Sequence, residues 1–245
     1  STKAGSIVAS QAGKAIKKTV LELGGSNALV VFDDADLDKA AEICVKARFQ
    51  NTGQSCIAGK RLLIQEEVYD KFLNKIKTQI QNLNVGNPMD EKIDISVLAR
   101  TDLAENLKSQ LHKSVQLGAE VLLGGQQDKT FFEPTIVKNV TQDMPIFNEE
   151  TFGPLLAVTA FNNEEEAVKL INTSKYRLGV SLFTQDKSKY QRLIPQIEDG
   201  AVFINALVKS DPRLPFGGTK HSGYGRELGR EGILEFANIK TVYIQ

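Results

Sequence analysis

The 245-residue sequence predicts an α/β fold in which a mostly parallel sheet is flanked by helices on both faces. Short runs that are β-branched or continuously apolar alternate along the chain with segments whose apolar residues recur at helical spacing. The sequence has no internal repeat and no low-complexity tract. Its length is therefore sufficient for one large domain, or for one domain with pieces of another.

The first elements lead from a helix into two short strands. Residues 6–17 have helical composition, and residues 19–23 and 27–32 are expected to be strands because they are apolar or β-branched. Carboxylates at residues 33–36 then precede a helix expected at residues 37–49, where the helix dipole favours negative charge.

The rest of the chain continues this alternation. The further helices are expected at residues 69–83, 101–117, 164–172, 187–197 and 227–236. The further strands are expected at residues 61–65, 120–123, 155–161, 180–184, 201–205 and 239–244. A long Gly-rich loop covers residues 214–226. The last strand has no evident partner, so we expect it to pair with another sheet, such as one in another subunit.

Composition argues against several classes of protein. Lys plus Arg and Asp plus Glu both total 30, which gives no electrostatic reason to bind nucleic acid or a membrane surface. No apolar run is long enough to span a bilayer, and we expect neither a signal peptide nor a metal site. The two cysteines, Cys44 and Cys56, are a poor disulfide framework, so we expect reduced thiols in the cytoplasm.

Cys56 is the candidate nucleophile. It ends the polar run Asn51-Thr52-Gly53-Gln54-Ser55-Cys56, whose Gly and hydroxyl residues indicate an accessible thiol rather than a core cysteine. The two histidines, His112 in a charged helix and His221 in the Gly-rich loop, are both expected at the surface. A Cys-His dyad is therefore not favoured, and backbone N–H groups with a helix N-terminus are the alternative means of lowering the thiol pKa.

Glu22 is the candidate general base. It lies among leucines at the end of an expected strand and is followed by Gly24 and Gly25. One interpretation is an exposed alternate position of the strand. The other is a half-buried carboxylate whose pKa is raised enough to accept a proton near neutral pH. The two glycines would allow a ligand to approach the backbone closely.

These motifs together resemble those of the aldehyde dehydrogenase family. The matching segments, spread over the whole chain, are Leu21–Gly25, Asn51–Cys56, Glu150–Pro154, Pro215–Gly223 and the phosphate-binding turn remnant Ser1–Gly5. The separation of Glu22 and Cys56, 34 positions (56 minus 22), also agrees with that family. Several motifs in the correct order are far more specific than any one of them.

The resemblance implies an oxidation of an aldehyde that depends on NAD or NADP. Cys56 would attack the aldehyde carbon, and Glu22 would activate water to hydrolyse the resulting thioester. Glu150 would hydrogen-bond the nicotinamide ribose, Phe152 would pack near the nicotinamide, and Ser1 would meet the pyrophosphate at a helix N-terminus. Without the resemblance, Glu150 would be interpreted as a surface acid and Phe152 as a core residue.

The resemblance also implies a division of the chain. Residues 1–23 would end a dinucleotide-binding domain, and residues 24–215 would form the catalytic domain. Residues 216–236 would return to the cofactor domain, and residues 237–245 would form an oligomerisation strand in a homo-dimer or homo-tetramer. Family members are longer, so most of the NAD(P) site would lie in a missing N-terminal part. We therefore expect this chain alone to bind NAD(P) weakly and to lack turnover, which isothermal titration would test.

The substrate candidates follow from a finer resemblance to bacterial succinate-semialdehyde dehydrogenases in residues 210–229. Arg213 would hold the substrate carboxylate, although a purely structural arginine is equally compatible with the sequence. Gln50 replaces an Arg found in some of those enzymes, and Ala58 replaces a second cysteine, so no redox switch is expected. The competing functions are acylation of coenzyme A, which Glu22 disfavours, a cofactor-free thiol esterase, and a non-catalytic oligomerising fragment.

Overall fold

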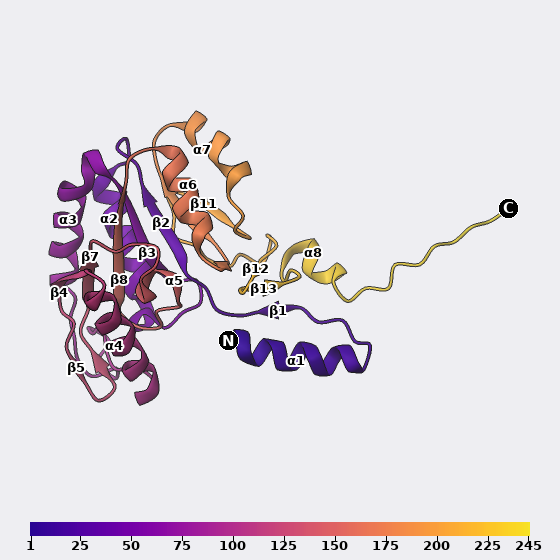
Figure 1. Ribbon diagram of the computed structural model, residues 1–245. Coiled ribbons are helices and arrows are strands. Elements are labelled where there is room, and N and C mark those ends of the chain that lie inside the picture. Colours follow the sequence, from indigo (N-terminus) through magenta and orange to yellow (C-terminus); the bar gives the residue numbers. More distant parts are fainter.

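The computed structural model describes residues 1–245 and is built around a central seven-stranded sheet (Figure 1). Its strand order is β11-β10-β2-β3-β8-β7-β4, and every neighbouring pair is parallel except β4 with β7. The strands are β2 (Asn27–Val31), β3 (Gly59–Gln65), β4 (Glu120–Leu123), β7 (Thr135–Lys138), β8 (Leu155–Phe161), β10 (Val180–Phe183) and β11 (Val202–Ile204). The predicted mostly parallel sheet is confirmed.

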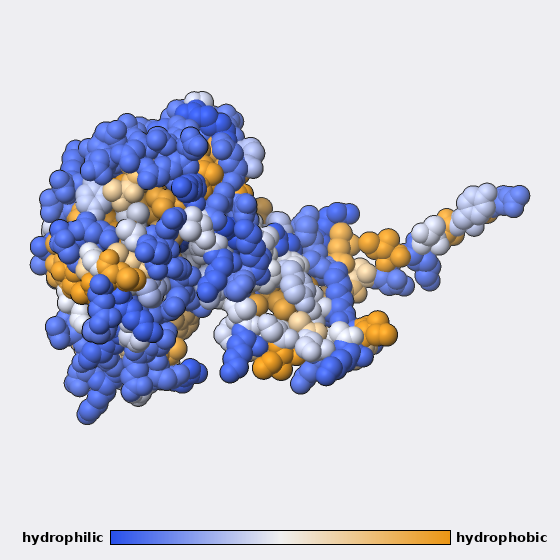
Figure 2. All heavy atoms as spheres, viewed as in Figure 1, coloured by the Kyte–Doolittle hydropathy of each residue, from blue (hydrophilic) through white to orange (hydrophobic).

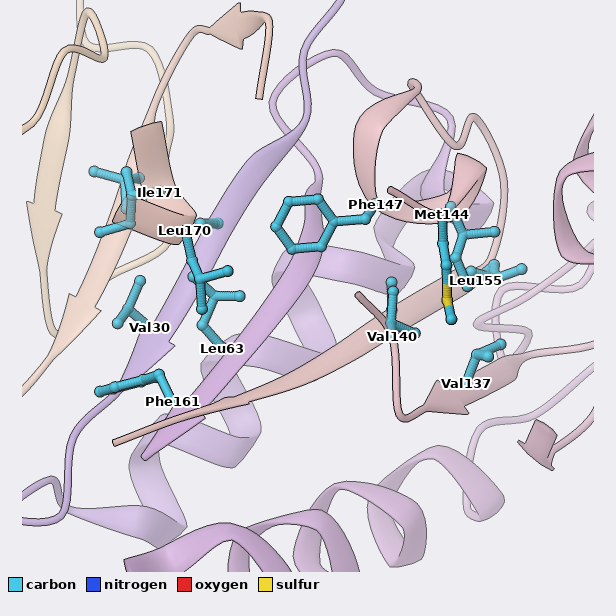
Figure 3. Packing of buried hydrophobic residues seen from close by; sticks show 14 of the residues in the cluster. Val30, Leu63, Val137, Val140, Met144, Phe147, Leu155, Phe161, Leu170 and Ile171 are labelled. Atoms are coloured by element: carbon cyan, nitrogen blue, oxygen red, sulfur yellow. The ribbon is translucent and has the colours of Figure 1, made fainter. Parts of the chain in front are cut away.

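Helices cover both faces of this sheet. One face packs against α2 (Leu37–Phe49) and α3 (Tyr69–Gln81). The other packs against α4 (Thr101–Gln116), α5 (Pro145–Asn148), α6 (Glu164–Thr173) and α7 (Lys187–Leu193). Because side chains alternate along a strand, neighbouring residues of β2 enter different cores. Val30 packs on the α4–α7 side (Figure 3), and Val31 packs on the α2–α3 side.

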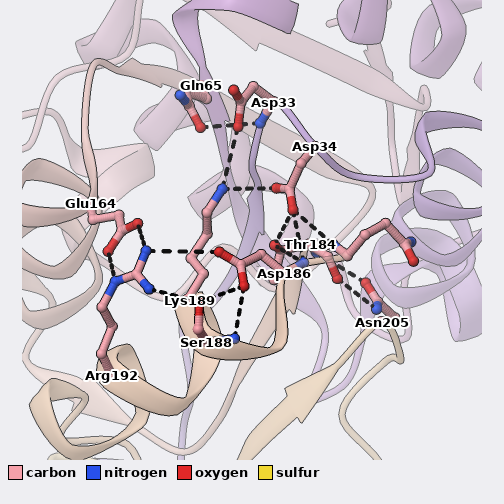
Figure 4. Close-up of polar contacts among 11 residues, drawn as sticks. Asp33, Asp34, Gln65, Glu164, Thr184, Asp186, Ser188, Lys189, Arg192 and Asn205 are labelled. Carbon is pink, nitrogen blue, oxygen red and sulfur yellow. Dashed lines mark hydrogen bonds and ion pairs between the residues drawn. The ribbon is translucent and has the colours of Figure 1, made fainter.

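Asp34, just after β2, ties the ends of two strands to α7 (Figure 4). Its carboxylate accepts hydrogen bonds from Thr184 Oγ1 at 2.6 Å and from the Asp186 N–H at 2.9 Å, and Lys189 Nζ lies at 2.9 Å. Burial raises the Asp34 pKa, but these donors outweigh it and bring the pKa to about 2. The carboxylate therefore remains charged and holds the start of α7 in place.

A smaller part of the chain lies beside the main sheet. It comprises α1 (Thr2–Lys14), β1 (Leu21–Glu22), β13 (Gly223–Tyr224) and α8 (Gly229–Leu234), and β1 pairs antiparallel with β13 (Figure 1). Two further short pairs are β9 (Tyr176–Arg177) with β12 (Thr219–Lys220) and β5 (Gln127–Asp128) with β6 (Phe131–Phe132). Apolar residues of α1, α8 and the C-terminal tail are exposed (Figure 2).

Several boundaries differ from the sequence predictions. The first helix begins at Thr2 because Ser1 caps it, and only Leu21 and Glu22 of the expected first strand pair. β7 and the short α5 were not predicted, and the last helix is confined to Gly229–Leu234. Residues 239–244 form no strand within the single chain, because no strand pairs with them. Their pairing in another subunit stays a prediction. None of the helices combines the length and apolarity needed to cross a membrane.

Candidate functional site

The loop before Cys56 has an unusual backbone that its own side chains stabilise. A 3-10 turn covers Gln50–Gly53, within which Asn51 and Thr52 have left-handed φ values of 54° and 55°. Asn51 Nδ2 donates to the Gln54 carbonyl at 2.9 Å, and Thr52 Oγ1 accepts from the Ser96 N–H at 3.1 Å. Such conformations persist where the surroundings fix them, and they cluster at functional sites. The loop therefore has one defined path.

Two of the motifs found in the sequence pack against each other. A Cβ atom on Gly53 would lie 2.5 Å from the Gly153 carbonyl oxygen, so only glycine allows the two loops to approach this closely. Below them, buried Arg48 donates from Nη2 to the Thr151 carbonyl at 3.0 Å. Residues 150–154 are thus held directly beside the Cys56 loop.

Lys60 is a buried cation beneath that loop, and the sequence reasoning did not select it. Its side chain is 0% exposed, and Nζ donates to the carbonyls of Ser55 at 2.8 Å and Cys56 at 2.9 Å. Nζ also lies 3.6 Å from Glu150 Oε1. Burial lowers the Lys60 pKa to about 7, against the opposing effect of Glu150. The available signal was a pair of cations, Lys60 and Arg61, directly before the apolar run Leu62-Leu63-Ile64 of the same strand.

The half-buried Cys56 thiol is less acidic than we expected. Its pKa is raised because burial disfavours the thiolate, and the Glu22 and Glu150 carboxylates add to that effect. Lys60 and the backbone N–H of Ile57 act in the opposite direction but do not prevail. The expectation of a lowered thiol pKa was therefore wrong for the chain by itself. His112 and His221 are both exposed, as predicted, and neither acts on the thiol.

Glu22 is the half-buried carboxylate that the sequence hypothesis described. Its Oε1 accepts a hydrogen bond from the Gly218 N–H at 3.2 Å, whereas its buried Oε2 has no hydrogen-bond partner. Burial raises the Glu22 pKa to about 7, the Gly218 hydrogen bond opposes this, and the charge of Glu227 adds to it. The free oxygen and the pKa suit a group that accepts a proton near neutral pH.

The Gly-rich loop and the Gly24-Gly25 pair bring Glu22 toward the Cys56 loop. Glu22 is paired with Gly223 across β1 and β13. A Cβ atom on Gly25 would lie 2.3 Å from the Cys56 carbonyl oxygen. The glycine that we expected to admit a ligand therefore admits the backbone of the nucleophile loop instead. Three motifs that are distant in sequence meet at this place.

The cofactor candidates lie at two points of this region. Glu150 Oε1 accepts from the Gly25 N–H at 3.0 Å, so the residue faces the chain interior and is not a free surface acid. Phe152 is half-buried and belongs to neither hydrophobic cluster, which leaves part of its ring open to a partner. Ser1 is exposed at the N-terminus of α1, and the next residue, Thr2, donates from Oγ1 to the His221 carbonyl at 3.2 Å.

The substrate candidates are not brought together. Arg213 is 85% exposed, and its guanidinium donates to both oxygens of Asp211, at 2.9 Å and 2.6 Å. Gln50 lines a hollow of about 410 Å³ between α2 and α3, which includes neither Arg213 nor Cys56. Their roles in substrate binding stay predictions.

Comparison with known proteins decides the family. The model of the aldehyde dehydrogenase family matches residues 1–242. The chain belongs to the aldehyde dehydrogenase family. A relative from Synechocystis sp., described as a probable succinate-semialdehyde dehydrogenase (NADP+), is 46% identical over 100% of this chain and 54% of its own length. A Mycobacterium ulcerans succinate-semialdehyde dehydrogenase (NADP+) is 42% identical over 100% of this chain and 54% of its own length.

Solved structures of aldehyde dehydrogenases share the fold described above. A succinate-semialdehyde dehydrogenase from Burkholderia pseudomallei superposes with a TM-score of 0.93 at 36% identity, covering 96% of this chain and 50% of that one. Lactaldehyde dehydrogenase from Escherichia coli superposes with a TM-score of 0.96 at 34% identity, covering 100% of this chain and 52% of that one. The chain thus spans about half the length of these proteins. Since enzymes named for different aldehydes fit equally well, the fold does not select the substrate.

Proposed function

We propose that the protein is an NAD(P)-dependent aldehyde dehydrogenase that uses Cys56 as nucleophile and Glu22 as general base. The observation that carries this proposal is the carboxylate of Glu22. It is half-buried, has one unpartnered buried oxygen and a pKa of about 7, and is near enough to influence the Cys56 thiol. A hydrolytic step on a thioester needs a base of this kind beside the acylated cysteine.

In the proposed mechanism the Cys56 sulfur adds to the aldehyde carbon and forms a thiohemiacetal. NAD(P)+ bound beside Cys56 would supply the acceptor for the hydride that leaves this carbon. The thioester left on Cys56 is then attacked by a water molecule whose proton passes to Glu22 Oε2, and the carboxylic acid is released. The backbone N–H of Cys56 is one donor for the oxyanion.

The residues present fit part of an NAD(P) site. The open face of Phe152 suits packing against a flat ring, and Glu150, beside it, carries a carboxylate that would hold a ribose hydroxyl. Ser1 opens a helix whose first-turn N–H groups favour an anion such as pyrophosphate. Both NAD and NADP are compatible with these groups.

Turnover and its intermediate test the proposal directly. In a version that spans the full length of the relatives, an aldehyde and NAD(P)+ are expected to yield NAD(P)H, and Cys56→Ser is expected to abolish this turnover, whereas residues 1–245 alone are expected to lack it. Glu22→Gln should accumulate an acyl adduct on Cys56, visible by intact mass, because deacylation lacks its base. Cys44→Ala serves as the matched thiol control, since Cys44 is fully buried. Turnover by the Cys56→Ser protein would contradict the mechanism, and acetate release from p-nitrophenyl acetate without cofactor would favour the esterase alternative.

Succinate semialdehyde is the substrate that we propose, and Arg213 is the residue proposed to hold its carboxylate. The support is the name of the relatives together with an exposed guanidinium whose forked donors match a carboxylate. Arg213 would have to leave Asp211 to do so. Arg213→Met is expected to raise KM for succinate semialdehyde about tenfold or more, and to change KM for an uncharged aldehyde much less. Equal changes for both would refute the role.

The wider setting is also proposed. We expect residues 24–215 to act as the catalytic domain and residues 237–245 to pair with another subunit in a homo-dimer or homo-tetramer, in a cytoplasm that keeps both free thiols reduced. The unpaired apolar tail supports subunit pairing. Light scattering with and without residues 237–245 would test it, and an unchanged molar mass would contradict it.

A further inference from the structure

Lys60 occupies a position that connects the two halves of the candidate site. Its Nζ binds the carbonyls of Ser55 and Cys56 from below, at 2.8 Å and 2.9 Å. Glu150, 3.6 Å from Nζ, in turn accepts the Gly25 N–H at 3.0 Å. A continuous polar chain thus runs from the segment that carries the base to the segment that carries the thiol.

These contacts hold the backbone of Gly25 closely against the Cys56 carbonyl. The backbone of Gly25 already lies so near the Cys56 carbonyl oxygen that a Cβ atom would be at 2.3 Å. The Ser55 carbonyl also accepts the Ala58 N–H at 3.2 Å, whereas the Cys56 carbonyl accepts from Lys60 Nζ and would lose that hydrogen bond with the side chain. Lys60 therefore determines where the Cys56 carbonyl, and with it the Cys56 backbone, is held.

We propose that Lys60 is a positioning residue for Cys56, which clamps the nucleophile loop through two carbonyls and presents a positive charge to the thiol. The proposal deepens the function proposed above and rests on the assignment of Cys56 as the nucleophile. It gives a role to a buried cation that the mechanism does not otherwise use.

The charged groups around Lys60 and Cys56 determine how the two effects of Lys60, its hydrogen bonds to the loop carbonyls and its positive charge, depend on pH. Cys56 faces Lys60, Glu22 and Glu150, and Lys60 faces Glu150 and Arg48 as well as the thiol. Below a pKa of about 7 Lys60 is an ammonium that favours the thiolate. Above it the neutral amine still has two N–H donors for the two carbonyls. The charge effect is therefore confined to the lower pH range, whereas the clamp persists.

Three substitutions separate the clamp from the charge. Lys60→Met removes both, Lys60→Gln keeps a donor without the charge, and Lys60→Arg keeps donors and charge. The readouts are the alkylation rate of Cys56 by iodoacetamide and the amide hydrogen exchange of residues 51–58. Cys56→Ser identifies the reacting thiol. Neither readout requires substrate or dehydrogenase turnover, so failure of this proposal is distinguishable from failure of the proposed function.

Loss of the facing charge should raise the thiol pKa by about one unit. After the compensating rise in intrinsic nucleophilicity, alkylation near pH 6.5 should be about threefold slower in the Met and Gln variants than in the wild type or Lys60→Arg. Above about pH 9 the difference between the Gln variant and the wild type should vanish. Exchange of residues 51–58 should accelerate in the Met variant and much less in the Gln variant. The proposal would be overturned if the folded Met and Gln variants had the same amide hydrogen exchange in residues 51–58 as the wild type and alkylated Cys56 at the wild-type rate at every pH. If only the Gln variant folds, its alkylation profile alone decides the charge effect.

Discussion

Replacing Glu22 by Gln should stabilise the protein above neutral pH, because the native fold holds this carboxylate at an electrostatic disadvantage. The folded-state pKa is about 7, whereas the ordinary value is 4.5, and burial is the main cause. Between these two values the folded protein binds more protons at Glu22 than the unfolded chain does. The free energy of unfolding therefore falls as pH rises from 4.5 to about 7 and is constant above that range, as far as Glu22 is concerned.

The size of the effect follows from the same two values. Each pKa unit corresponds to about 1.4 kcal/mol. Because Glu22 is only about half shielded from solvent, the full conversion must be reduced by about half. The wild type should therefore be about 1 to 2 kcal/mol less stable than Glu22→Gln at high pH. For a protein of this size that difference raises the Tm of the variant by about 3 to 6 °C.

Thermal unfolding of both proteins at about pH 5 and about pH 8 measures this difference. The Tm advantage of Glu22→Gln should be present at the higher pH and largely absent at the lower one, where the wild-type carboxyl is protonated in the native state. Glu105→Gln, on the exposed face of α4, is the matched control and should show no such dependence. A Tm difference between wild type and Glu22→Gln that is equal at both pH values would refute the assignment of a raised pKa.

Two further substitutions test the backbone contact and the polar network. Gly25→Ala would place a Cβ atom 2.3 Å from the Cys56 carbonyl oxygen, so this substitution should slow alkylation of Cys56 and lower the Tm. Gly13→Ala in α1 is the control, because a Cβ atom there would have nothing within 4 Å. It should leave alkylation unchanged and add up to about 1 kcal/mol to the free energy of unfolding. Asp34→Asn should lower the free energy of unfolding, measured by chemical denaturation near neutral pH, by about 2 kcal/mol, because the donors around Asp34 lose a charged acceptor. This difference between variant and wild type should disappear as the pH falls from 3.8 through about 2. Equal free energies of unfolding at about pH 7 would show that the charged network adds no net stability.

Local pattern in the sequence was enough to find the sheet, its covering helices and the motifs. The continuous apolar runs of β2, β3 and β8 are the signature of strands buried on both faces, and these strands form the centre of the sheet. The missed elements are all short. β7 and α5 are four residues each, and the strands β5, β6, β9, β12 and β13 are two residues each, so neither the strand period nor the helix period is visible in them. Whether residues 239–244 form a strand could not be predicted from their own sequence, because a strand forms only where another strand hydrogen-bonds with it.

The sequence by itself determined which residues we propose to carry the chemistry, since Cys56 and Glu22 stand out by residue type, setting and spacing within the family motif. Only the tertiary structure decided the burial and the pKa of those residues. The Cys56 pKa is raised and the Glu22 pKa reaches about 7 because segments far away in the chain exclude water from them. The fold likewise brings Lys60 to Glu150, which is distant in the chain, whereas the Ser55 and Cys56 carbonyls that it binds are only five and four positions away. Desolvation and charge proximity depend on the packing of distant segments, and no local pattern encodes them.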